Sequence, residues 1–447
     1  MISNFKKSKL YQEKVNKLIP GGAHTYSKGD DQFPENSPRA MKSGKGAYLT
    51  DLDGNEYLDT TMGLASISLG HAYDEIIEVV KSEIDFGVNF QKPSYIELEV
   101  AEKFLSLLPT HDMIKFAKNG STVTTAAVKL ARAKTGRKMV AFPYDHPFYS
   151  YDDWFIGSTE CKSGIPEEIS NLSVTFKSCS IDSLKALFDK YPNQIACIIT
   201  EPEKNTCGNT CNCKISPQVF LKRAIDLCHE NGALFILDEM QSGFRTSFPG
   251  SMTKYDIIPD MATWGKGIAN GFSFCALTGI REVMELGSIY NIGKEKVFLI
   301  STTHGAETHT ARAAIKTIEV FQSQNVIEHN HGIGRLVIEQ TTNLIKSKNL
   351  EDFVEVVRCE WYPAFNFYNT KGESDLSIKT LMMQEMIKNG IMFQGFFLPC
   401  FSHTKEDIHI FSKAFSSSLD ILKNAIETGV DKYLIGNSIK PVFRKLN

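Results

Sequence analysis

The sequence contains no long apolar run, and no stretch reaches the roughly 18 uncharged apolar residues that a membrane-spanning helix needs. Its first residues, MISNFKKSKLYQEKVNKLIP, are polar and charged and lack the apolar core of a signal peptide. An excess of one charge is also missing, since 49 Lys and Arg stand against 52 Asp and Glu. This balance favours neither nucleic acid nor an anionic membrane as a partner. We expect a cytoplasmic protein.

The composition is that of a globular protein, with 447 residues of which 42% are hydrophobic, enough for one large domain plus a smaller one. Of its ten cysteines, Cys197 and Cys275 lie in apolar runs and are predicted to be buried thiols of a reducing compartment. Cys207, Cys211 and Cys213 stand together in CGNTCNC, a polar stretch that matches no common zinc pattern. We interpret it as a loop of free thiols, with a metal or redox module as the alternative.

The middle of the chain alternates strands and helices. Residues 113–138 predict a strand, a tight turn and a helix that ends near Gly136. Buried strands are predicted at 194–202 and 233–240, and residues 216–232 predict a helix with Ser216 as its cap and Pro217 in its first turn. This order indicates an α/β fold with a mostly parallel sheet and helices on both faces.

The two ends of the chain differ from the middle. Residues 46–60 predict a β-hairpin that turns at Asp53-Gly54, and residues 403–426 predict an amphipathic helix. Thr404 opens that helix, with Asp407 three residues further on. We expect both ends to build a second, smaller lobe.

Four features of the middle region predict one ligand. Asp238 ends the apolar run LFIL, and a buried carboxylate at the end of a strand calls for a cationic partner. The stretch KNGSTVTT (118–125) opens a helix, whose N-terminus favours phosphate. Lys266 stands between two glycines in WGKGI, where the missing side chains leave room beside an amine that reacts with carbonyls. The aromatic run YDHPFYSYDDWF (144–155) offers a ring to stack on a flat heterocycle.

Each feature also has a plain structural interpretation: an ion pair for Asp238, an ordinary cap for the Ser and Thr residues, a solvated loop for Lys266, and core packing for the aromatic run. Together, however, they match pyridoxal 5′-phosphate, which pairs a lysine with an acidic partner of its ring nitrogen.

The sequence resembles the class III, fold-type I aminotransferases, and within them most closely the glutamate-1-semialdehyde aminomutase branch and its relatives in surface-polysaccharide gene clusters. The motifs LDEMQSGFR (237–245) and WGKGIANG (264–271) carry the resemblance, which runs over nearly the whole chain. It implies an α/β fold with a mostly parallel, seven-stranded type of sheet flanked by helices. It also implies a small α+β domain from both termini, which gives a division into 1–65, 66–330 and 331–447.

The resemblance further implies site residues and a homodimer with shared active sites. Lys266 bonds to the cofactor and shuttles a proton, Asp238 pairs with the ring nitrogen, and Phe148 stacks on the ring. Thr303 reaches the phosphate of the neighbouring subunit. The remaining residues implied to bind the cofactor are Gly120, Ser121 and Thr122 at the phosphate, and Tyr149, Glu201, Asn205 and Gln241 around the ring.

The chain departs from the aminomutases where the substrate binds. HTYSK places Thr25 and Lys28 where those enzymes carry a serine and an arginine, and a lysine does not replace a bidentate guanidinium. The gating loop is replaced by residues 155–173, and FQGFFLPCF (393–401) lacks the expected glutamate. These departures argue against 5-aminolevulinate as the product.

We therefore predict an aminotransferase that moves an amino group from a donor such as L-glutamate to a small carbonyl or keto-sugar acceptor, with surface-glycan biosynthesis as a suggested setting. An intramolecular aminomutase or an epimerase is the alternative within the same chemistry. A non-catalytic binding or scaffold protein is the alternative outside it, and retention of both Lys266 and Asp238 argues against that alternative.

Overall fold

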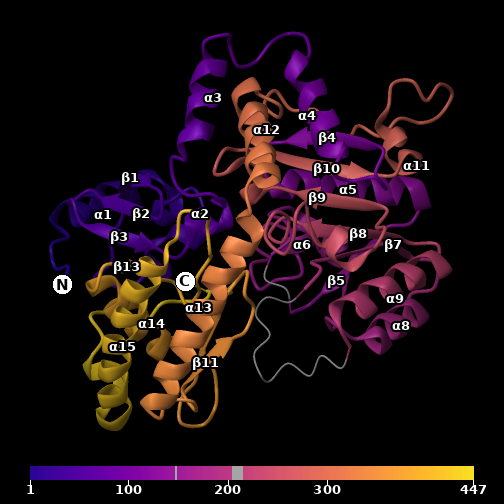
Figure 1. The fold of residues 1–447 in the computed structure, drawn as a ribbon. Helices are drawn as coiled ribbons and strands as arrows, with labels where there is room; N and C mark the ends of the chain where they lie inside the picture. The colour runs from indigo at the N-terminus through magenta and orange to yellow at the C-terminus, as the bar shows by residue number, and fades with distance from the viewer. Residues whose placement is uncertain (146–147, 204–214, 447) are drawn as a thin grey trace. The chain divides into compact units, whose positions relative to one another are not determined.

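The computed structural model describes residues 1–145, 148–203 and 215–446, and its described residues form two compact units (Figure 1). The terminal unit combines residues 1–73 with 328–442. The central unit comprises residues 74–203 and 215–327, together with 443–446. The predicted boundaries at 65/66 and 330/331 differ from these limits by eight and three residues, and the predicted division stays a prediction.

A seven-stranded sheet forms the middle of the central unit, in the order β4-β10-β9-β8-β7-β5-β6. Its strands run in parallel except β10, which is antiparallel to both of its neighbours, so the predicted mostly parallel sheet is confirmed. The strands are β4 (Met113–Ala117), β5 (Met139–Pro143), β6 (Ser173–Phe176), β7 (Ile195–Thr200), β8 (Leu234–Glu239), β9 (Met261–Trp264) and β10 (Cys275–Gly279).

Local sequence signals explain the helices that flank this sheet. In α5 (Gly120–Thr135), which packs on β7, β9 and β10, the residues Val123, Ala127, Leu130 and Ala131 are all buried as predicted. Helix α9 (Pro217–Glu230) packs on β8 and starts as predicted, because the Ser216 side chain accepts a hydrogen bond from the backbone N–H of Val219.

The other helices of the central unit include α12 (Thr308–Ser323), which packs along α3 (Asp74–Ile84) and α4 (Tyr95–Leu105) (Figure 1). The shorter ones are α6 (Asp153–Ile156), α7 (Glu167–Ser170), α8 (Ile181–Lys190), α10 (Ser251–Tyr255), η4 (Lys266–Ala269), α11 (Arg281–Met284) and η5 (Glu285–Gly287).

The terminal unit contains a small sheet to which both ends of the chain contribute. Strands β1 (Met41–Lys45), β2 (Tyr48–Asp51), β3 (Glu56–Asp59) and β13 (Ile391–Met392) lie in that order, and β13 is parallel to β3. The predicted hairpin of residues 46–60 is confirmed as β2 and β3, whereas β1 was not predicted. A second hairpin consists of β11 (Val354–Val357) and β12 (Ala364–Phe367).

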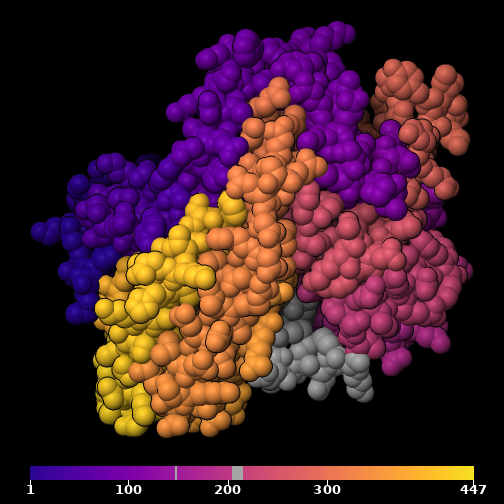
Figure 2. Space-filling view, viewed as in Figure 1, coloured from indigo at the N-terminus to yellow at the C-terminus, as the bar shows by residue number. Residues whose placement is uncertain are grey.

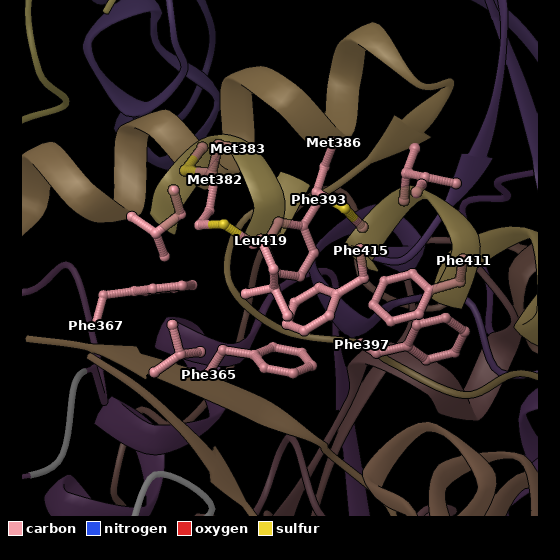
Figure 3. Close-up of a cluster of buried hydrophobic side chains, with 14 of the residues drawn as sticks. Phe365, Phe367, Met382, Met383, Met386, Phe393, Phe397, Phe411, Phe415 and Leu419 are labelled. Atoms are coloured by element: carbon pink, nitrogen blue, oxygen red, sulfur yellow. The ribbon is translucent and has the colours of Figure 1, made fainter. Parts of the chain in front are cut away.

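Long helices and aromatic side chains form the core of the terminal unit. Phe365, Phe393, Phe397, Phe411 and Phe415 pack with methionines of α14 (Figure 3). The helices are α1 (Lys6–Leu18), α2 (Met62–Ala65), α13 (Val326–Ser347), α14 (Leu376–Lys388) and α15 (Lys405–Thr428), with short turns η1 (Pro20–Gly22), η2 (Tyr26–Lys28), η3 (Asp30–Gln32) and η6 (Val430–Lys432). Helix α15 begins with the predicted capping box of Thr404 and Asp407.

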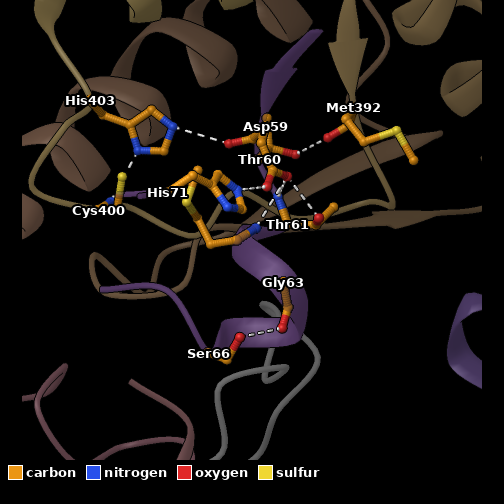
Figure 4. Close-up of polar contacts among 10 residues, drawn as sticks. Asp59, Thr60, Thr61, Gly63, Ser66, His71, Met392, Cys400 and His403 are labelled. Carbon is orange, nitrogen blue, oxygen red and sulfur yellow. Dashed lines mark hydrogen bonds and ion pairs between the residues drawn. The ribbon is translucent and has the colours of Figure 1, made fainter. Parts of the chain in front are cut away.

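A strained turn in the terminal unit is held by a buried polar cluster. All four residues of α2 have positive φ, including the non-glycine residues Met62, Leu64 and Ala65. The Asp59 carboxylate accepts hydrogen bonds from the backbone N–H groups of Thr61 and Met62 and lies 2.7 Å from His71 Nε2 (Figure 4). These bonds offset the cost of the left-handed backbone.

Among the helices of the described residues, none is both long and apolar enough to cross a membrane.

Candidate functional site

Lys266 lies directly after β9, in a backbone conformation that few residues other than glycine adopt. Its φ is 49°, and the side chain is partly exposed. Burial lowers the pKa of the Lys266 amine, while the negative charges of Glu201 and Asp238 oppose that shift. A strained lysine with a lowered pKa is suited to act as a nucleophile.

The glycine before this lysine serves a different purpose from the one we predicted. A Cβ on Gly265 would lie 2.3 Å from Met240 Sδ and 2.7 Å from Cys275 Sγ. A Cβ on Gly120 would likewise lie 3.0 Å from Met240 Sδ. The space beside Gly265 is therefore filled by protein sulfur atoms, so the glycine lets the chain approach Met240 rather than leaving room for a ligand on that side.

Asp238 lies near the carboxyl end of β8, and its side chain is only 2% exposed. Both hydrogen bonds that the described residues make to this carboxylate reach Oδ1, from Met240 N and from Thr263 Oγ1, each at 2.9 Å. Burial, and then the charge of Glu201, raise the pKa of Asp238 to about 6. Oδ2 remains available to a cationic partner, whose charge would lower that pKa again.

The start of α5 presents free backbone donors. Asn119 caps the helix, because its Oδ1 accepts from Thr122 N at 3.0 Å and from Thr122 Oγ1 at 3.1 Å. The backbone N–H groups of Gly120 and Ser121 donate to no other described residue. Thr122 is therefore engaged by the cap, while the Gly120 and Ser121 amides are open to an anion.

The aromatic segment is fixed against the same helix start. Ser121 Oγ accepts from Tyr151 N at 3.0 Å, and Thr124 Oγ1 donates to the carbonyl of Tyr149 at 3.0 Å. Phe148 is 48% exposed and meets Phe155 edge-on at 5.7 Å between ring centroids, whereas Tyr149 is buried. An exposed ring beside an open helix N-terminus fits the predicted stacking of Phe148, which stays a prediction.

Two further predicted residues follow the central strands. Glu201 comes directly after β7, where its backbone N–H points to the Tyr149 hydroxyl at 3.4 Å. Its charge acts on both Asp238 and Lys266, so the structure brings these three groups together. Gln241 follows β8 and is half-buried. Asn205, Cys207, Cys211 and Cys213 lie outside the described residues.

Thr303 lies in an exposed loop before α12, and its carbonyl accepts from Asn89 Nδ2 at 3.0 Å. Glu307 anchors this loop from inside. Its carboxylate lies 3.0 Å from Lys118 Nζ and 2.7 Å from His304 Nδ1. Since Lys118 immediately precedes the cap of α5, the Thr303 loop is tied to the open helix start.

Sequence reasoning missed Asn119, Thr263 and the contact between Glu307 and Lys118. Asn119 could have been predicted from the sequence, because an asparagine three positions before a polar helix residue is a standard N-cap pattern. Thr263 could not, since only the register of β8 against β9 places it opposite Asp238. The contact between Glu307 and Lys118 joins distant loops, and no local pattern announces it.

The residues present fit pyridoxal 5′-phosphate. Asp238 Oδ2 suits a protonated ring nitrogen, the open amides of Gly120 and Ser121 suit a phosphate, and the Lys266 amine suits an aldehyde. No described residue competes for Asp238 Oδ2 or for these two amides.

Comparisons with known proteins agree with this arrangement. The family model for class III aminotransferases matches residues 31–419. The chain is 28% identical over 424 residues to a glutamate-1-semialdehyde 2,1-aminomutase of Francisella philomiragia, covering 89% of this chain and 94% of the relative. It is also 28% identical over 417 residues to a 3-aminobutyryl-CoA aminotransferase of Cloacimonas acidaminovorans, covering 93% and 97%. The FumI protein of Sphingopyxis sp. MTA144, solved in its PLP internal aldimine form, has the same fold, with a TM-score of 0.83 and 22% identity over 95% of this chain and 98% of that one.

Proposed function

The chain belongs to the class III aminotransferases and is a pyridoxal 5′-phosphate enzyme, and we propose that it transfers the amino group of L-glutamate to a small carbonyl acceptor. The observation that carries this proposal is the presence, at one edge of the sheet, of a carboxylate oxygen of Asp238 with no donor among the described residues and of the Lys266 amine, whose pKa burial lowers. Both stand just past or near the carboxyl ends of neighbouring parallel strands, where ligands of α/β sheets bind.

When bound, the cofactor supplies an aldehyde for the amino group and a protonated ring that withdraws electrons from the reacting carbon. Asp238 holds a proton on the ring nitrogen through Oδ2, and Thr263 and Met240 N orient the carboxylate through Oδ1. Gly120 and Ser121 bind the phosphate through their backbone amides, with Thr122 kept in place by Asn119.

Lys266 is the proposed proton carrier. Burial lowers the pKa of the amine and so favours its neutral form, which is the form that takes a proton from the substrate carbon and returns it. Phe148 is proposed to cover one face of the ring, with Tyr149 and Glu201 beside it. Gln241 forms part of the wall. Asn205 keeps its predicted place near the cofactor as part of this proposal.

A homodimer with shared active sites is the proposed assembly, with Thr303 contributing to the neighbouring phosphate. The central unit exposes large apolar side chains in two stretches. Between η5 and α12, a segment that projects from the surface in Figure 2 carries Ile289, Tyr290, Ile292 and Phe298, each at least 66% exposed. A second stretch near Thr303 exposes Ile84, Phe86, Val88, Phe90, Tyr95 and Leu98. Surface of this kind is suited to a partner of the same chain.

The acceptor is proposed to be a keto-sugar or another small carbonyl, with surface-glycan biosynthesis as one setting and the cytoplasm as the compartment. Relatives are named as an aminomutase and as a CoA-ester aminotransferase, so other substrate classes are alternatives to a keto-sugar. An intramolecular aminomutase or epimerase is the second candidate, since it would use the same Lys266 and Asp238. The lysine at position 28 in place of an arginine favours the transferase over the aminomutase.

The test is the visible absorption spectrum of the holoenzyme before and after addition of L-glutamate. We expect L-glutamate to convert the band to that of the pyridoxamine form and to release 2-oxoglutarate, and Lys266→Ala to abolish the conversion. A holoenzyme whose band L-glutamate leaves unchanged would contradict the proposed donor. Mass measurement of the native protein in solution tests the dimer separately.

A further inference from the structure

The loop that carries Thr303 also presents an oriented histidine. His304 Nδ1 lies 2.7 Å from Glu307 Oε1, while the imidazole is 67% exposed and the carboxylate is 7% exposed. Because Nδ1 is directed at Glu307, Nε2 is the nitrogen left to a ligand, and it donates to an anion when the ring is protonated. Nε2 contacts no partner within the ranges that the structure describes.

Glu307 is built to hold that imidazole in one position. Its Oε2 accepts from the backbone N–H of Gly305 at 3.2 Å and lies 3.0 Å from Lys118 Nζ. Burial opposes ionisation, yet the hydrogen bonds from Lys118 and His304 and the charge of Lys118 hold the pKa of Glu307 below its ordinary value. The backbone of His304 is fixed as well, because its carbonyl accepts from Thr302 Oγ1 at 2.6 Å.

This arrangement places a fixed imidazole on an exposed loop. A surface histidine gains little from one exposed ion pair, but here a buried carboxylate that also contacts Lys118 fixes the orientation of the ring. The loop brings the imidazole next to Thr303, and adjacent Cα atoms are about 3.8 Å apart. Wherever Thr303 reaches a cofactor phosphate, His304 is therefore within side-chain reach of the same site.

We propose that His304 binds a carboxylate of the substrate in the active site of the neighbouring subunit, namely the carboxylate farthest from the substrate's amino group. Glu307 is the positioning residue of His304. The inference rests on the proposed dimer and on the proposed dicarboxylate donor. It supplies a cation for a substrate anion in a chain that has lysine, not arginine, at position 28. A protonated imidazole with one outward N–H makes a charge-assisted hydrogen bond to a carboxylate.

A second histidine offers a matched control. His229 Nε2 lies 3.1 Å from Asp260 Oδ2, with the imidazole 50% exposed and the carboxylate 9% exposed. It has the same construction of an exposed ring on a buried acid, but it lies in the last turn of α9, on a different element from the Thr303 loop.

The first experiment measures binding of glutarate to the holoenzyme by calorimetry, which needs no turnover. We expect His304→Leu to weaken glutarate binding about 10- to 100-fold, Glu307→Gln to weaken it less, and His229→Leu to leave it unchanged. Equal binding of glutarate by the parent and His304→Leu would overturn the proposal, as would a parent that binds no glutarate. A parent that binds glutarate but gains no pyridoxamine form from L-glutamate would instead refute the proposed donor.

The second experiment asks which subunit supplies the histidine. Lys266→Ala and His304→Leu subunits are mixed and re-associated into mixed dimers. The rate of L-glutamate turnover is then measured at low L-glutamate concentrations, so that the KM can be determined. If His304 acts in the neighbouring subunit, the one site of the mixed dimer that has Lys266 receives His304 from the Lys266→Ala subunit. We therefore expect the KM of the mixed dimers for L-glutamate to return to the parental value. A KM that stays at the value of His304→Leu would overturn the assignment to the neighbouring subunit.

Discussion

Strand β8 ends in two neighbouring carboxylates, Asp238 and Glu239, that are almost equally buried and yet differ in what surrounds them. Asp238 is 2% exposed and Glu239 is 0% exposed. Burial raises the pKa of both, to about 6 for Asp238 and about 7 for Glu239. Within the described part of the chain, donors reach only Oδ1 of Asp238, whereas Glu239 accepts from Ser242 Oγ at one oxygen and from Met252 N at the other.

The difference teaches that burial and a raised pKa do not identify a functional carboxylate. Glu239 bonds the start of α10 and the turn after β8, and its hydrogen-bonding capacity is used within the protein. Asp238 keeps one oxygen without a donor among the described residues, on a side chain that is only 2% exposed, and that oxygen is open to a ligand. The unused acceptor, more than the pKa, separates the site residue from the structural one.

The largest expected effect comes from removing the charge of Asp238. Asp238→Asn keeps the shape and the Oδ1 acceptor but loses the negative charge proposed to hold a proton on the cofactor ring. We expect turnover of L-glutamate to fall about 10²- to 10³-fold, with an unchanged circular dichroism spectrum. Turnover close to that of the parent would contradict the functional role of Asp238 that distinguishes it from Glu239.

Glu239→Gln tests the other side of the comparison. The amide offers only one acceptor oxygen, so either Ser242 Oγ or Met252 N faces an N–H group. We expect the free energy of unfolding in urea to fall by about 1–3 kcal/mol, while the folded variant keeps the visible band of the bound cofactor. Loss of the cofactor band without loss of stability would show that Glu239 takes part in cofactor binding.

A pH series sharpens the comparison further. Because both folded-state pKa values lie above those of the unfolded chain, the folded protein binds more protons between about pH 4 and pH 7. The contribution of these two groups to stability is therefore greatest at low pH and declines as the pH rises. In the cofactor-free protein, we expect Asp238→Asn to gain on the order of 1–2 kcal/mol relative to the parent from pH 4 to pH 7. Urea unfolding at each pH measures this difference, and a constant difference would contradict it.

The smallest effect is expected at a carboxylate that is not buried at all. Glu282 pairs with Lys134 on the surface of the central unit, where its side chain is 73% exposed. Solvent screens such a pair, so Glu282→Gln should leave both the melting temperature and turnover at the parental values. A clear loss in either measurement would show that exposure is a poor guide in this unit.

Sequence patterns predicted the parts of the fold that depend on near neighbours. The caps of α9 and α15 and the hairpin of residues 46–60 follow from residues a few positions apart. Asp238 and Lys266 could also be predicted from the sequence. Asp238 lies near the end of a buried strand and Lys266 comes just after one, and parallel strands present their carboxyl ends at one edge of the sheet.

The rest depends on which distant segments meet, and no pattern of one segment encodes that. Thr263 became a partner of Asp238 through strand register, and Glu307 met Lys118 through the packing of two loops. Gly265 shows the same limit, since its neighbours in the sequence gave no sign that Met240 and Cys275 fill the adjacent space.

The packing of Met240 between Gly120 and Gly265 constrains how this protein can diverge. A Cβ at Gly265 would collide with the sulfur atoms of Met240 and Cys275, and a Cβ at Gly120 would require the Met240 side chain to shift, so the size of residue 240 limits what both positions accept. A shorter residue at position 240 alone would leave a void between the helix start and the lysine turn. Change at these three positions is therefore concerted, and in any collection of descendants they should covary as one unit that links the phosphate end of the site to its amine.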